Sequence, residues 1–319
     1  MERVLRRLIV PEDFAGRRLD QAAAVLLPEF SRSRLKTWID AGQLTLAGQT
    51  ARARTRIQGG EELVLAAELE AAVAIEPEQI PIDVVYRDDA LLVIDKPVGL
   101  VVHPGAGNRS GTLQNALLHL HPEHAVLPRA GLIHRLDKNT SGLLLIARTL
   151  ETQKILSAAL QRREIRRTYE AVCQGVLTGG GSIDAPIGRH PRERTKMAVI
   201  ERGRPARTHY RVVERFRAHT HCEIELETGR THQIRVHMAH VRAPLVGDSV
   251  YGGRPRLPSQ PSERLRLLLQ SFGRQALHAT RLAFTHPVSG EPVSFASGLA
   301  PDFRDLLAAL REDAAGAHA

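Results

Sequence analysis

Cysteine and aromatic residues are scarce in this chain. Its 319 residues include only two cysteines, Cys173 and Cys222, which stand in unrelated sequence contexts. This argues against a disulfide framework and against a zinc site built on paired cysteines, and it favours a reducing, cytoplasmic setting. Aromatic residues account for 4% of the chain, so a tyrosine within a polar segment is more informative than usual. No apolar run reaches the length of a signal peptide or a membrane span, which predicts a soluble intracellular protein.

Nucleotide-binding motifs and common catalytic motifs are absent too. The three glycines at 179–181 follow a predicted strand, but they open no helix and lack the lysine of a phosphate-binding loop. The segment "HRLDKN" is similar to a protein-kinase catalytic loop only superficially, because Leu136 is interposed and no Asp-Phe-Gly follows. The Gly-x-Ser-x-Gly motif does not occur either. These absences argue against a kinase, a dinucleotide-dependent enzyme and an α/β-hydrolase.

Negative charge is in deficit. The chain has 44 lysines and arginines against 35 aspartates and glutamates, a net charge of +9 with neutral histidines. Between residues 162 and 217 there are fourteen basic residues and six acidic ones. Such an excess favours a polyanionic partner, nucleic acid above all, over a small acidic substrate. The alternative is a basic surface without a partner.

Residues 1–75 are predicted to form a small RNA-binding domain. Apolar spacing predicts a helix that ends at Pro28, then a second helix with Ser31 as its N-cap, then short strands joined at glycines. The basic residues between positions 31 and 56, against a lone Asp40, are Arg32, Arg34, Lys36, Arg52, Arg54 and Arg56. This arrangement resembles an S4-type RNA-binding module, with Arg32, Arg34 and Lys36 as RNA contacts. The alternative is a solvated helix face.

Residues 76–319 are predicted to form a second domain of the α+β class. The boundary is indicated by two prolines in "AIEPEQIPID", and a hairpin is predicted around "RDDA". Helices are predicted at "TLQNALLHL" and "ETQKILSAALQRREI", and strands at "RTYEAVCQGV", "THCEIELET" and "HQIRVHMA". Strands outnumber helices without regular alternation, which predicts a mixed sheet rather than a doubly wound one.

A dense polar segment lies directly before a predicted core strand. In "GLIHRLDKNTSGLLLIART", Asp137 stands among cations just ahead of the apolar run at 143–146. A carboxylate there is either a structural cap or a working group. To stay ionised it would need a guanidinium partner in bidentate contact, and Arg235 is the candidate because its neighbours Ile234 and Val236 indicate a semi-buried site. The alternative is an ion pair that only braces two strands.

Two further segments supply candidate site residues. Tyr169 follows a basic run on a predicted strand, where its ring could stack on a flat heterocycle or simply fill the core. His232 and His237 would point to opposite faces of a strand, which favours hydrogen bonding or phosphate contact over a metal site. A basic chain with one acid and one stacking ring, without a metal or nucleotide loop, favours chemistry on a base that has left its stack.

These segments also carry a resemblance to a known family. The segment "RAGLIHRLDKNTSGLLLIART" is similar to the signature of the RluA/RluD-type pseudouridine synthases. Other segments match that family in the same order: "VVHPGAGNRSGTLQNAL", "PIGRHPRERTKMAV", "GRPARTHYRV", "LETGRTHQIRVHMAHVRAPLVGDSVYG" and "RQALHATRLAFTHPVSGE". The resemblance covers essentially the whole chain, since the D-type members carry an S4 module before the catalytic domain. It implies a pseudouridine synthase fold with a mixed, mainly antiparallel central sheet.

The resemblance implies roles for individual residues. Asp137 would break the bond between ribose and uracil N1, either as a nucleophile or as a base in an elimination. Tyr169 would stack on the uracil and take part in a deprotonation, and Arg235 would hold Asp137 charged and oriented. Arg135 would fill the gap left by the flipped uridine, and Leu277 would line the apolar side of the pocket. Substrate contacts are also expected from His134, Arg230 and His232, and the reaction would use no cofactor and no metal.

Two positions depart from the family pattern. Asn139 stands where a second aspartate is frequent, and Arg204 stands where lysine is frequent. The first change removes a negative charge beside Asp137, and the second keeps the charge but alters the phosphate geometry. Neither position belongs to the expected trio of Asp137, Tyr169 and Arg235.

The predicted function is conversion of uridine to pseudouridine in large-subunit (23S) ribosomal RNA. The D-type resemblance implies several uridines of one stem-loop of the helix 69 type. The expected partner is this RNA or the assembling large subunit. The protein is expected to be a monomer and to have no membrane partner. Two alternatives remain open: a synthase acting on transfer RNA or another ribosomal loop, and a non-catalytic RNA-binding or assembly factor.

Overall fold

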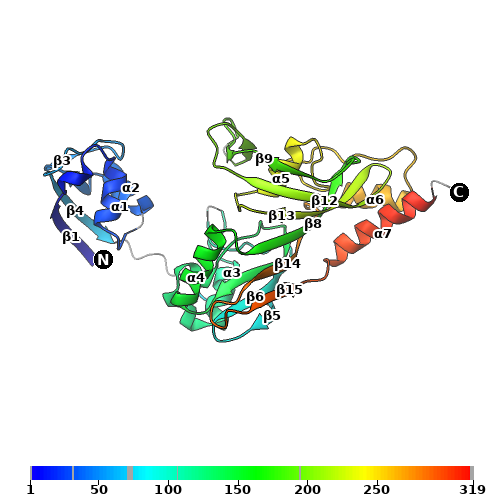
Figure 1. Ribbon diagram of the computed structural model, residues 1–319, viewed down its shortest axis with the longest axis horizontal. Coiled ribbons are helices and arrows are strands. Elements are labelled where there is room, and N and C mark those ends of the chain that lie inside the picture. Colours follow the sequence, from blue (N-terminus) through cyan, green and yellow to red (C-terminus); the bar gives the residue numbers. More distant parts are fainter. Residues whose placement is uncertain (1, 31, 70–74, 106, 194, 317–319) are drawn as a thin grey trace. The chain divides into compact units, whose positions relative to one another are not determined.

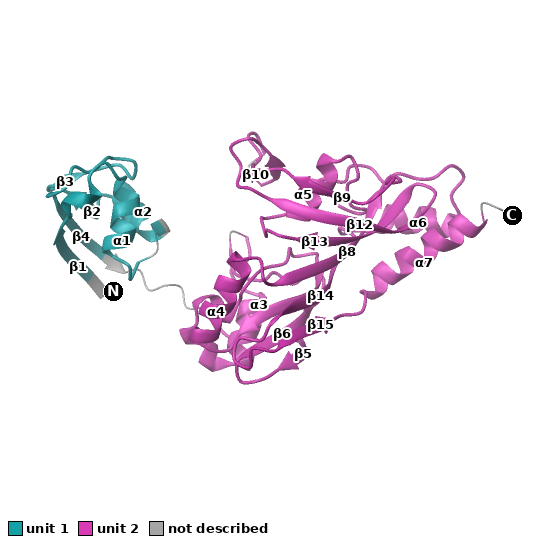
Figure 2. Cartoon of the chain, in the orientation of Figure 1, with its two compact units in different colours: residues 1–74 teal, residues 75–319 magenta. Residues whose placement is uncertain are grey.

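The computed structural model describes residues 2–30, 32–69, 75–105, 107–193 and 195–316. The chain divides into two compact units, residues 1–74 and 75–319 (Figure 2). This division falls one residue from the expected boundary, and each unit is treated by itself below. Among the described residues, no helix combines the length and the apolar composition that crossing a membrane would require.

Unit 1 is a four-stranded antiparallel sheet with two helices. The sheet has the order β1-β4-β2-β3, and its first strand, absent from the predicted elements, precedes the helices. The elements are β1 (Glu2–Ile9), η1 (Glu12–Phe14), α1 (Leu19–Leu26), α2 (Arg32–Asp40), β2 (Leu44–Leu46), β3 (Gln49–Thr50) and β4 (Glu62–Leu69). Both predicted helices are confirmed; Ser31, the expected N-cap, lies outside the described residues. Leu35, Trp38 and Ile39 of α2 are buried, as their spacing predicted.

Unit 2 holds most of the chain (Figure 1). Its strands are β5 (Asp83–Arg87), β6 (Leu91–Lys96), β7 (Ser141–Ala147), β8 (Arg166–Gln174), β9 (Gly181–Asp184), β10 (Ile187–Arg189), β11 (Met197–Val199), β12 (Arg207–Arg215), β13 (His219–Leu226), β14 (Leu277–Thr285) and β15 (Pro292–Ala296). Its helices are α3 (Leu113–Leu120), α4 (Leu150–Gln161), α5 (Gln233–His240), α6 (Glu263–Ser271) and α7 (Pro301–Gly316), with short 3-10 turns η2 (Pro122–Val126) and η3 (Pro128–Gly131).

The main sheet of unit 2 is mixed and mainly antiparallel. Its strand order is β5-β6-β7-β14-β8-β13-β12-β9, with β15 paired to β14, and β10 pairs separately with β11. The contact between β7 and β14 is parallel, and the other pairings of the described strands are antiparallel. The predicted α+β class and mixed sheet are therefore confirmed, as is the hairpin that joins β5 to β6.

Both faces of the sheet are covered near its centre. All seven residues of β7 are buried. Leu144 and Ile146 point into one apolar cluster, whereas Leu143 and Leu145 point into another on the opposite face. Because successive side chains of a strand alternate between faces, a strand buried on both sides has the continuous apolar run seen in the sequence.

Strand β14 is the element that assembles the site. It pairs with β7 on one side and with β8 on the other, so His278 lies opposite Ser141, and Ala279 lies opposite Tyr169. The approach to β7 is close at Gly142, which has a φ of +108°; a Cβ there would lie 2.6 Å from the nitrogen of Ala279. Glycine is therefore required at this crossing.

One predicted element is wrong. The segment predicted as a strand, "HQIRVHMA", forms helix α5 with His232 as its N-cap residue. The residues at 234–237 alternate between apolar and polar, which fits a strand. The buried residues Ile234 and Met238, however, are four residues apart, which is the spacing of one helical face. Such a short apolar pattern does not distinguish the two. The strand-based reasoning about the faces of His232 and His237 therefore does not apply.

Candidate active site

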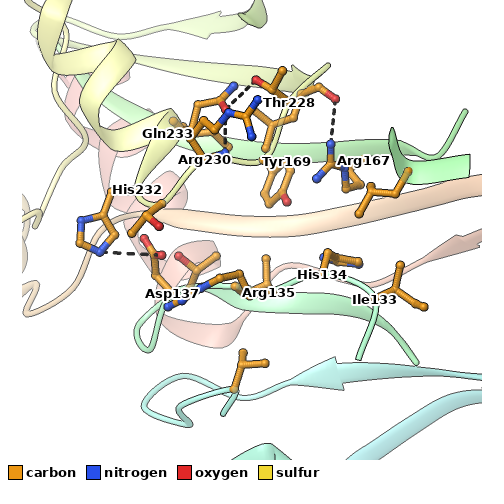
Figure 3. Close-up of a pocket in the computed structure, with 18 of the residues that line it drawn as sticks. Ile133, His134, Arg135, Asp137, Arg167, Tyr169, Thr228, Arg230, His232 and Gln233 are labelled. Carbon is orange, nitrogen blue, oxygen red and sulfur yellow. Dashed lines mark hydrogen bonds and ion pairs between the residues drawn. The ribbon is translucent and has the colours of Figure 1, made fainter. Parts of the chain in front are cut away.

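A pocket of about 530 Å³ in unit 2 gathers the candidate residues from four parts of the chain. They come from the segment before β7, from β8, from the start of α5 with the connection before it, and from the first residue of β14 (Figure 3). The eight site residues expected in unit 2 all line it: His134, Arg135, Asp137, Tyr169, Arg230, His232, Arg235 and Leu277. Its size suits a base turned out of its stack.

Asp137 is partly exposed at the pocket, and Arg235 is its cationic partner. Nη1 of Arg235 donates to Oδ2 of Asp137 at 3.1 Å. The bidentate partner of Arg235, however, is Asp248: Nε donates to Oδ2 at 2.7 Å, and Nη2 donates to Oδ1 at 2.9 Å. The expected contact thus exists, but through one nitrogen. The guanidinium plane is set by an aspartate that sequence reasoning missed.

Asp248 and Arg235 form a buried pair. Both side chains are almost inaccessible, and Asp248 Oδ1 also accepts hydrogen bonds from the backbone of Val250 and Tyr251. Burial alone would lower the pKa of Arg235, but the hydrogen bonds and charges of Asp248 and Asp137 raise it overall. Burial would raise the pKa of Asp248, and Arg235 lowers it overall. Both groups stay charged, so Asp137 faces a permanent cation.

His232 approaches Asp137 from another side of the pocket. Its Nε2 lies 3.9 Å from Oδ1 of Asp137 (Figure 3). Its Nδ1 lies 2.9 Å from the hydroxyl of Tyr251. Burial lowers the pKa of His232, against the attraction of Asp137. Tyr251 also stacks under Arg235, with the guanidinium carbon 5.0 Å from the ring centre. Tyr251 therefore contacts both Arg235 and His232, the two neighbours of Asp137.

The backbone that follows Asp137 is held by groups outside the pocket. The fully buried Lys96 donates from Nζ to the carbonyl of Lys138 at 3.0 Å, and to those of Pro97 and Leu100. Arg274 donates to the carbonyl of Asn139 at 3.3 Å. Burial lowers the pKa of Lys96 to about 7, against the attraction of Asp137. The loop that carries Asp137 is thus fixed by the buried amine of Lys96, whose pKa lies near neutral pH.

Tyr169 and Leu277 belong to the apolar part of the pocket. Both are almost fully buried and pack in the main apolar cluster of unit 2. Burial raises the pKa of Tyr169, so its hydroxyl is protonated at neutral pH. Burial likewise lowers the pKa of His134 to about 3, and its Nε2 accepts a hydrogen bond from the backbone of Leu145 at 3.3 Å. His134 is therefore neutral and ties the segment before Asp137 to β7.

The pocket is strongly basic. Seven arginines line it, against two carboxylates, those of Asp137 and Glu227. The arginines are Arg129, Arg135, Arg163, Arg167, Arg204, Arg230 and Arg235. Arg204, one of the two departures from the family pattern, is among them. This ratio matches the phosphate backbone of a nucleic acid.

The histidine that follows on α5 is committed to the protein's own structure. His237 is fully buried, with Nδ1 2.8 Å from the hydroxyl of Thr208 and Nε2 2.9 Å from the carbonyl oxygen of Ala185. Both ring nitrogens are thus occupied. This explains why His237, unlike His232, takes no part in lining the pocket.

The candidate RNA contacts of unit 1 lie on α2, and each has a partner on α1 or α2. Arg32 donates to the buried carboxylate of Asp20 at 2.6 Å, and Lys36 lies 3.5 Å from Asp40. The guanidinium of Arg34 lies 5.8 Å from the ring centre of Trp38. Arg32 and Lys36 remain more than half exposed, so a phosphate can reach them.

Comparison with known proteins supports this picture. Residues 90–240 match the family model described as RNA pseudouridylate synthase. The chain is 55% identical over 313 residues to "Ribosomal large subunit pseudouridine synthase D" of Xanthomonas campestris, covering 98% of this chain and 95% of the relative. It is 54% identical to the protein of that name from Pseudomonas aeruginosa, covering 97% of each.

A solved structure agrees on the fold. The structure of human RNA Pseudouridylate Synthase Domain Containing 4 superimposes with a TM-score of 0.55 at 28% identity, covering 72% of this chain and 93% of that one. The expected pseudouridine synthase fold is confirmed. Since identity above one half extends along almost the entire chain, the protein belongs to the RNA pseudouridylate synthase family and is an RNA pseudouridine synthase.

Proposed function

We propose that this enzyme converts uridine to pseudouridine in large-subunit ribosomal RNA, at several uridines of one stem-loop of the helix 69 type. The substrate is supported by the name that the relatives at 50–55% identity share. The observation that carries the proposal is Asp137, ion-paired to Arg235 in a pocket lined by seven arginines. A pure RNA-binding factor has no use for a carboxylate in a phosphate-binding pocket.

The chemistry assigned to Asp137 balances within the substrate itself. The bond from ribose C1′ to uracil N1 breaks, the base rotates, and C1′ bonds to C5. C5 loses its proton and N1 gains one, so product and substrate are isomers. The carboxylate can act as the nucleophile at C1′ or as the base that starts an elimination. Because the isomerisation has no net redox change and no leaving group that departs, we propose that it uses no cofactor and no metal.

The other residues that line the pocket bind and position the base. The ring of Tyr169 stacks on the uracil, and its protonated hydroxyl offers a hydrogen bond. Leu277 covers the apolar side of the base. Arg135, which is exposed at the pocket, takes the position of the flipped uridine and offsets part of an unstacking cost of a few kcal/mol. Arg230 and His232 bind the adjoining backbone, and neutral His134 shapes the floor.

We assign the remaining properties to the whole chain. Unit 1 acts as an S4-type RNA-binding domain, with Arg32, Arg34 and Lys36 toward the phosphates. Unit 2 is the catalytic domain. The enzyme works in the cytoplasm as a monomer, on the free RNA or on the assembling large subunit.

The test is tritium release from RNA labelled at C5 of uridine. Wild type is expected to release label from a large-subunit stem-loop transcript, because C5 exchanges its hydrogen for ribose. Asp137→Asn should release none above background while folding normally, and Asp305→Asn, a change of the same kind at an exposed position of α7, should match wild type.

The choice of RNA separates the alternatives. Release from transfer RNA alone would reject the ribosomal substrate but keep the enzyme. If Asp137→Asn were as active as wild type, Asp137 would not be the catalytic carboxylate. No release from any of the three, whether free rRNA, assembling subunits or transfer RNA, would favour the binding-factor alternative.

A further inference from the structure

A second cluster of potential ligands lies outside the pocket, at the end of α3. His121, Glu123 and His124 follow one another through the 3-10 turn η2, in the sequence His-Pro-Glu-His. One donor atom from each of the three lies within 4.8 Å of the others. Among the described residues this is the one group of three such side chains that is close enough to share a metal ion.

His124 has a nitrogen that its surroundings do not use. The residue is fully buried, and its Nδ1 lies 3.1 Å from the carbonyl oxygen of Ala130. A carbonyl only accepts, so Nδ1 carries the proton and Nε2 keeps a free lone pair. Nε2 is buried and has no hydrogen-bond partner among the residues that the structure describes. A histidine held by a backbone carbonyl through one nitrogen, with the other nitrogen unpaired, has the typical arrangement of a metal ligand.

His121 and Glu123 supply the other two donors. Nδ1 of His121 lies 3.1 Å from Oε1 of Glu123, and the side chain of His121 is 8% exposed. The rings of His121 and His124 stack, with centres 5.0 Å apart and planes 23° apart. Glu123 is 54% exposed, which leaves an entry path and room for a water ligand.

The geometry is close to what a metal requires. Zinc binds nitrogen and oxygen ligands at about 2.0–2.2 Å, which places tetrahedral donors roughly 3.3 Å apart. Nδ1 of His121 and Oε1 of Glu123, 3.1 Å apart, already have this spacing, and a ring nitrogen of His124 belongs to the same group of donors within 4.8 Å of one another. One group opposes a cation: Nη2 of Arg148 lies 3.5 Å from Oε1 of Glu123. Its other nitrogen, Nη1, is bound to the carbonyl of Asp88, so a small turn of Glu123 separates the charges.

We propose that His121, Glu123 and His124 bind one divalent transition-metal ion of the zinc type, with water as the fourth ligand. Two imidazoles and a carboxylate favour zinc over magnesium, which prefers oxygen ligands in an octahedron. The site is distinct from the proposed reaction, which needs no metal.

The position of the site gives the ion a structural role. His124 holds the carbonyl of Ala130, and both Ala130 and Arg129 have positive φ angles, 52° and 54°. Such angles are uncommon for residues with a Cβ and require support from neighbouring structure. This segment, η3, leads directly into the chain that carries Asp137, and Arg129 itself lines the pocket. An ion bound at η2 would therefore stiffen one wall of the pocket.

The test is zinc binding by the full-length chain after treatment with a chelator, measured by titration calorimetry. Wild type is expected to bind one equivalent of zinc chloride and to unfold at a higher temperature with zinc than without it. Magnesium chloride should produce neither effect. Glu123→Gln and His124→Ala should each weaken zinc binding roughly tenfold or more and lose the thermal shift. His119→Ala, which removes an exposed histidine near the end of α3, should bind like wild type.

The contrary outcomes are equally clear. No zinc binding by wild type, or equal affinity in wild type and Glu123→Gln, would overturn the proposal. Equal binding of magnesium and zinc would also overturn it, because it would indicate surface carboxylates. If His124→Ala failed to fold, Glu123→Gln would decide, since Glu123 is half exposed and its replacement leaves the buried packing intact. None of these results depends on pseudouridine formation, so the proposal can fail while the proposed function stands.

Discussion

Replacement of Asp248 by asparagine should separate the positioning of Arg235 from its charge. The substitution keeps the size of the side chain, but it puts an amide N–H₂ where one carboxylate oxygen accepts from Arg235. At least one of the two bonds, at 2.7 and 2.9 Å, is lost, so the buried guanidinium keeps the bond to Asp137 and at most one bond to the side chain at position 248. Breaking a buried pair from one side costs about 3–5 kcal/mol; the lower value applies here because asparagine still accepts one bond.

Two measurements follow from this magnitude. A loss of about 3 kcal/mol should lower the midpoint of thermal unfolding by roughly 6–12 °C in a domain of this size. Arg235 would also turn within the pocket and displace Asp137, and a misplacement of about 1 Å costs on the order of 100-fold in rate. We expect this loss in kcat for tritium release. KM should change little, because the arginines that face the RNA backbone are unaltered.

The matched control is Glu164→Gln. Glu164 binds Arg162 with the same two-bond geometry, at 2.7 and 2.8 Å, but both side chains are more than half exposed. Exposed pairs contribute little, so this variant should keep the stability and kcat of wild type. If Asp248→Asn lowered the unfolding midpoint but left kcat unchanged, Asp248 would be structural only. If the midpoint did not move, the buried pair would contribute no net stability.

Three further predictions follow from other features. Gly142→Ala should lower the free energy of unfolding by roughly 2–4 kcal/mol, because the added Cβ meets the backbone of Ala279. Gly179→Ala is the control, since there is open space around Gly179, and it should unfold like wild type. Equal unfolding midpoints for the two variants would contradict the close crossing of β7 and β14. The pKa of Lys96 is lowered by burial from 10.5 to about 7, so between these pH values the unfolded lysine holds a proton that the folded one has lost. Its contribution to the unfolding free energy should therefore rise with pH, by up to about 1.4 kcal/mol per pH unit. The unfolding free energy of Lys96→Met, measured with urea, should lack this rise. If the unfolding free energies of wild type and Lys96→Met changed with pH in parallel, the assignment would be refuted. Arg230→Ala should reduce the salt dependence of RNA affinity by about 0.7 in the log–log slope, and an unchanged slope would exclude a phosphate contact.

Much of the candidate site could be predicted from the sequence because its residues stand in recognisable local patterns. Asp137 stands out as an acid among cations before an apolar run, and Tyr169 stands out on a strand in a chain poor in aromatics. The hairpin around "RDDA" and the strand after Asp137 follow from turn residues and continuous apolar runs. These signals depend on neighbours in the chain, so no tertiary structure is needed to find them.

What the sequence did not predict depends on contacts between distant residues. Asp248 lies in "VGDSVYG", a segment with the composition of a turn, and nothing local indicates that it is buried against Arg235. Lys96 is similar: lysine is rarely buried, and only the folded chain brings three carbonyls to its amine. Strand β1 was missed because Leu5 and Ile9 are exposed, which hides the alternation expected of a strand.

The central position of β14 has a consequence for how the protein folds during its synthesis. This strand begins at Leu277, yet it lies between β7 and β8, and the hydroxyl of Ser141 bonds His278 across 137 positions of sequence. Contacts of such separation form late, because a long loop must close before they contribute any stability. During synthesis, Asp137 and Tyr169 leave the ribosome well before the strand that joins their elements. A nascent or prematurely terminated chain therefore carries the proposed catalytic side chains without the pocket that brings them together, so under the proposed function modification of RNA must await nearly complete translation.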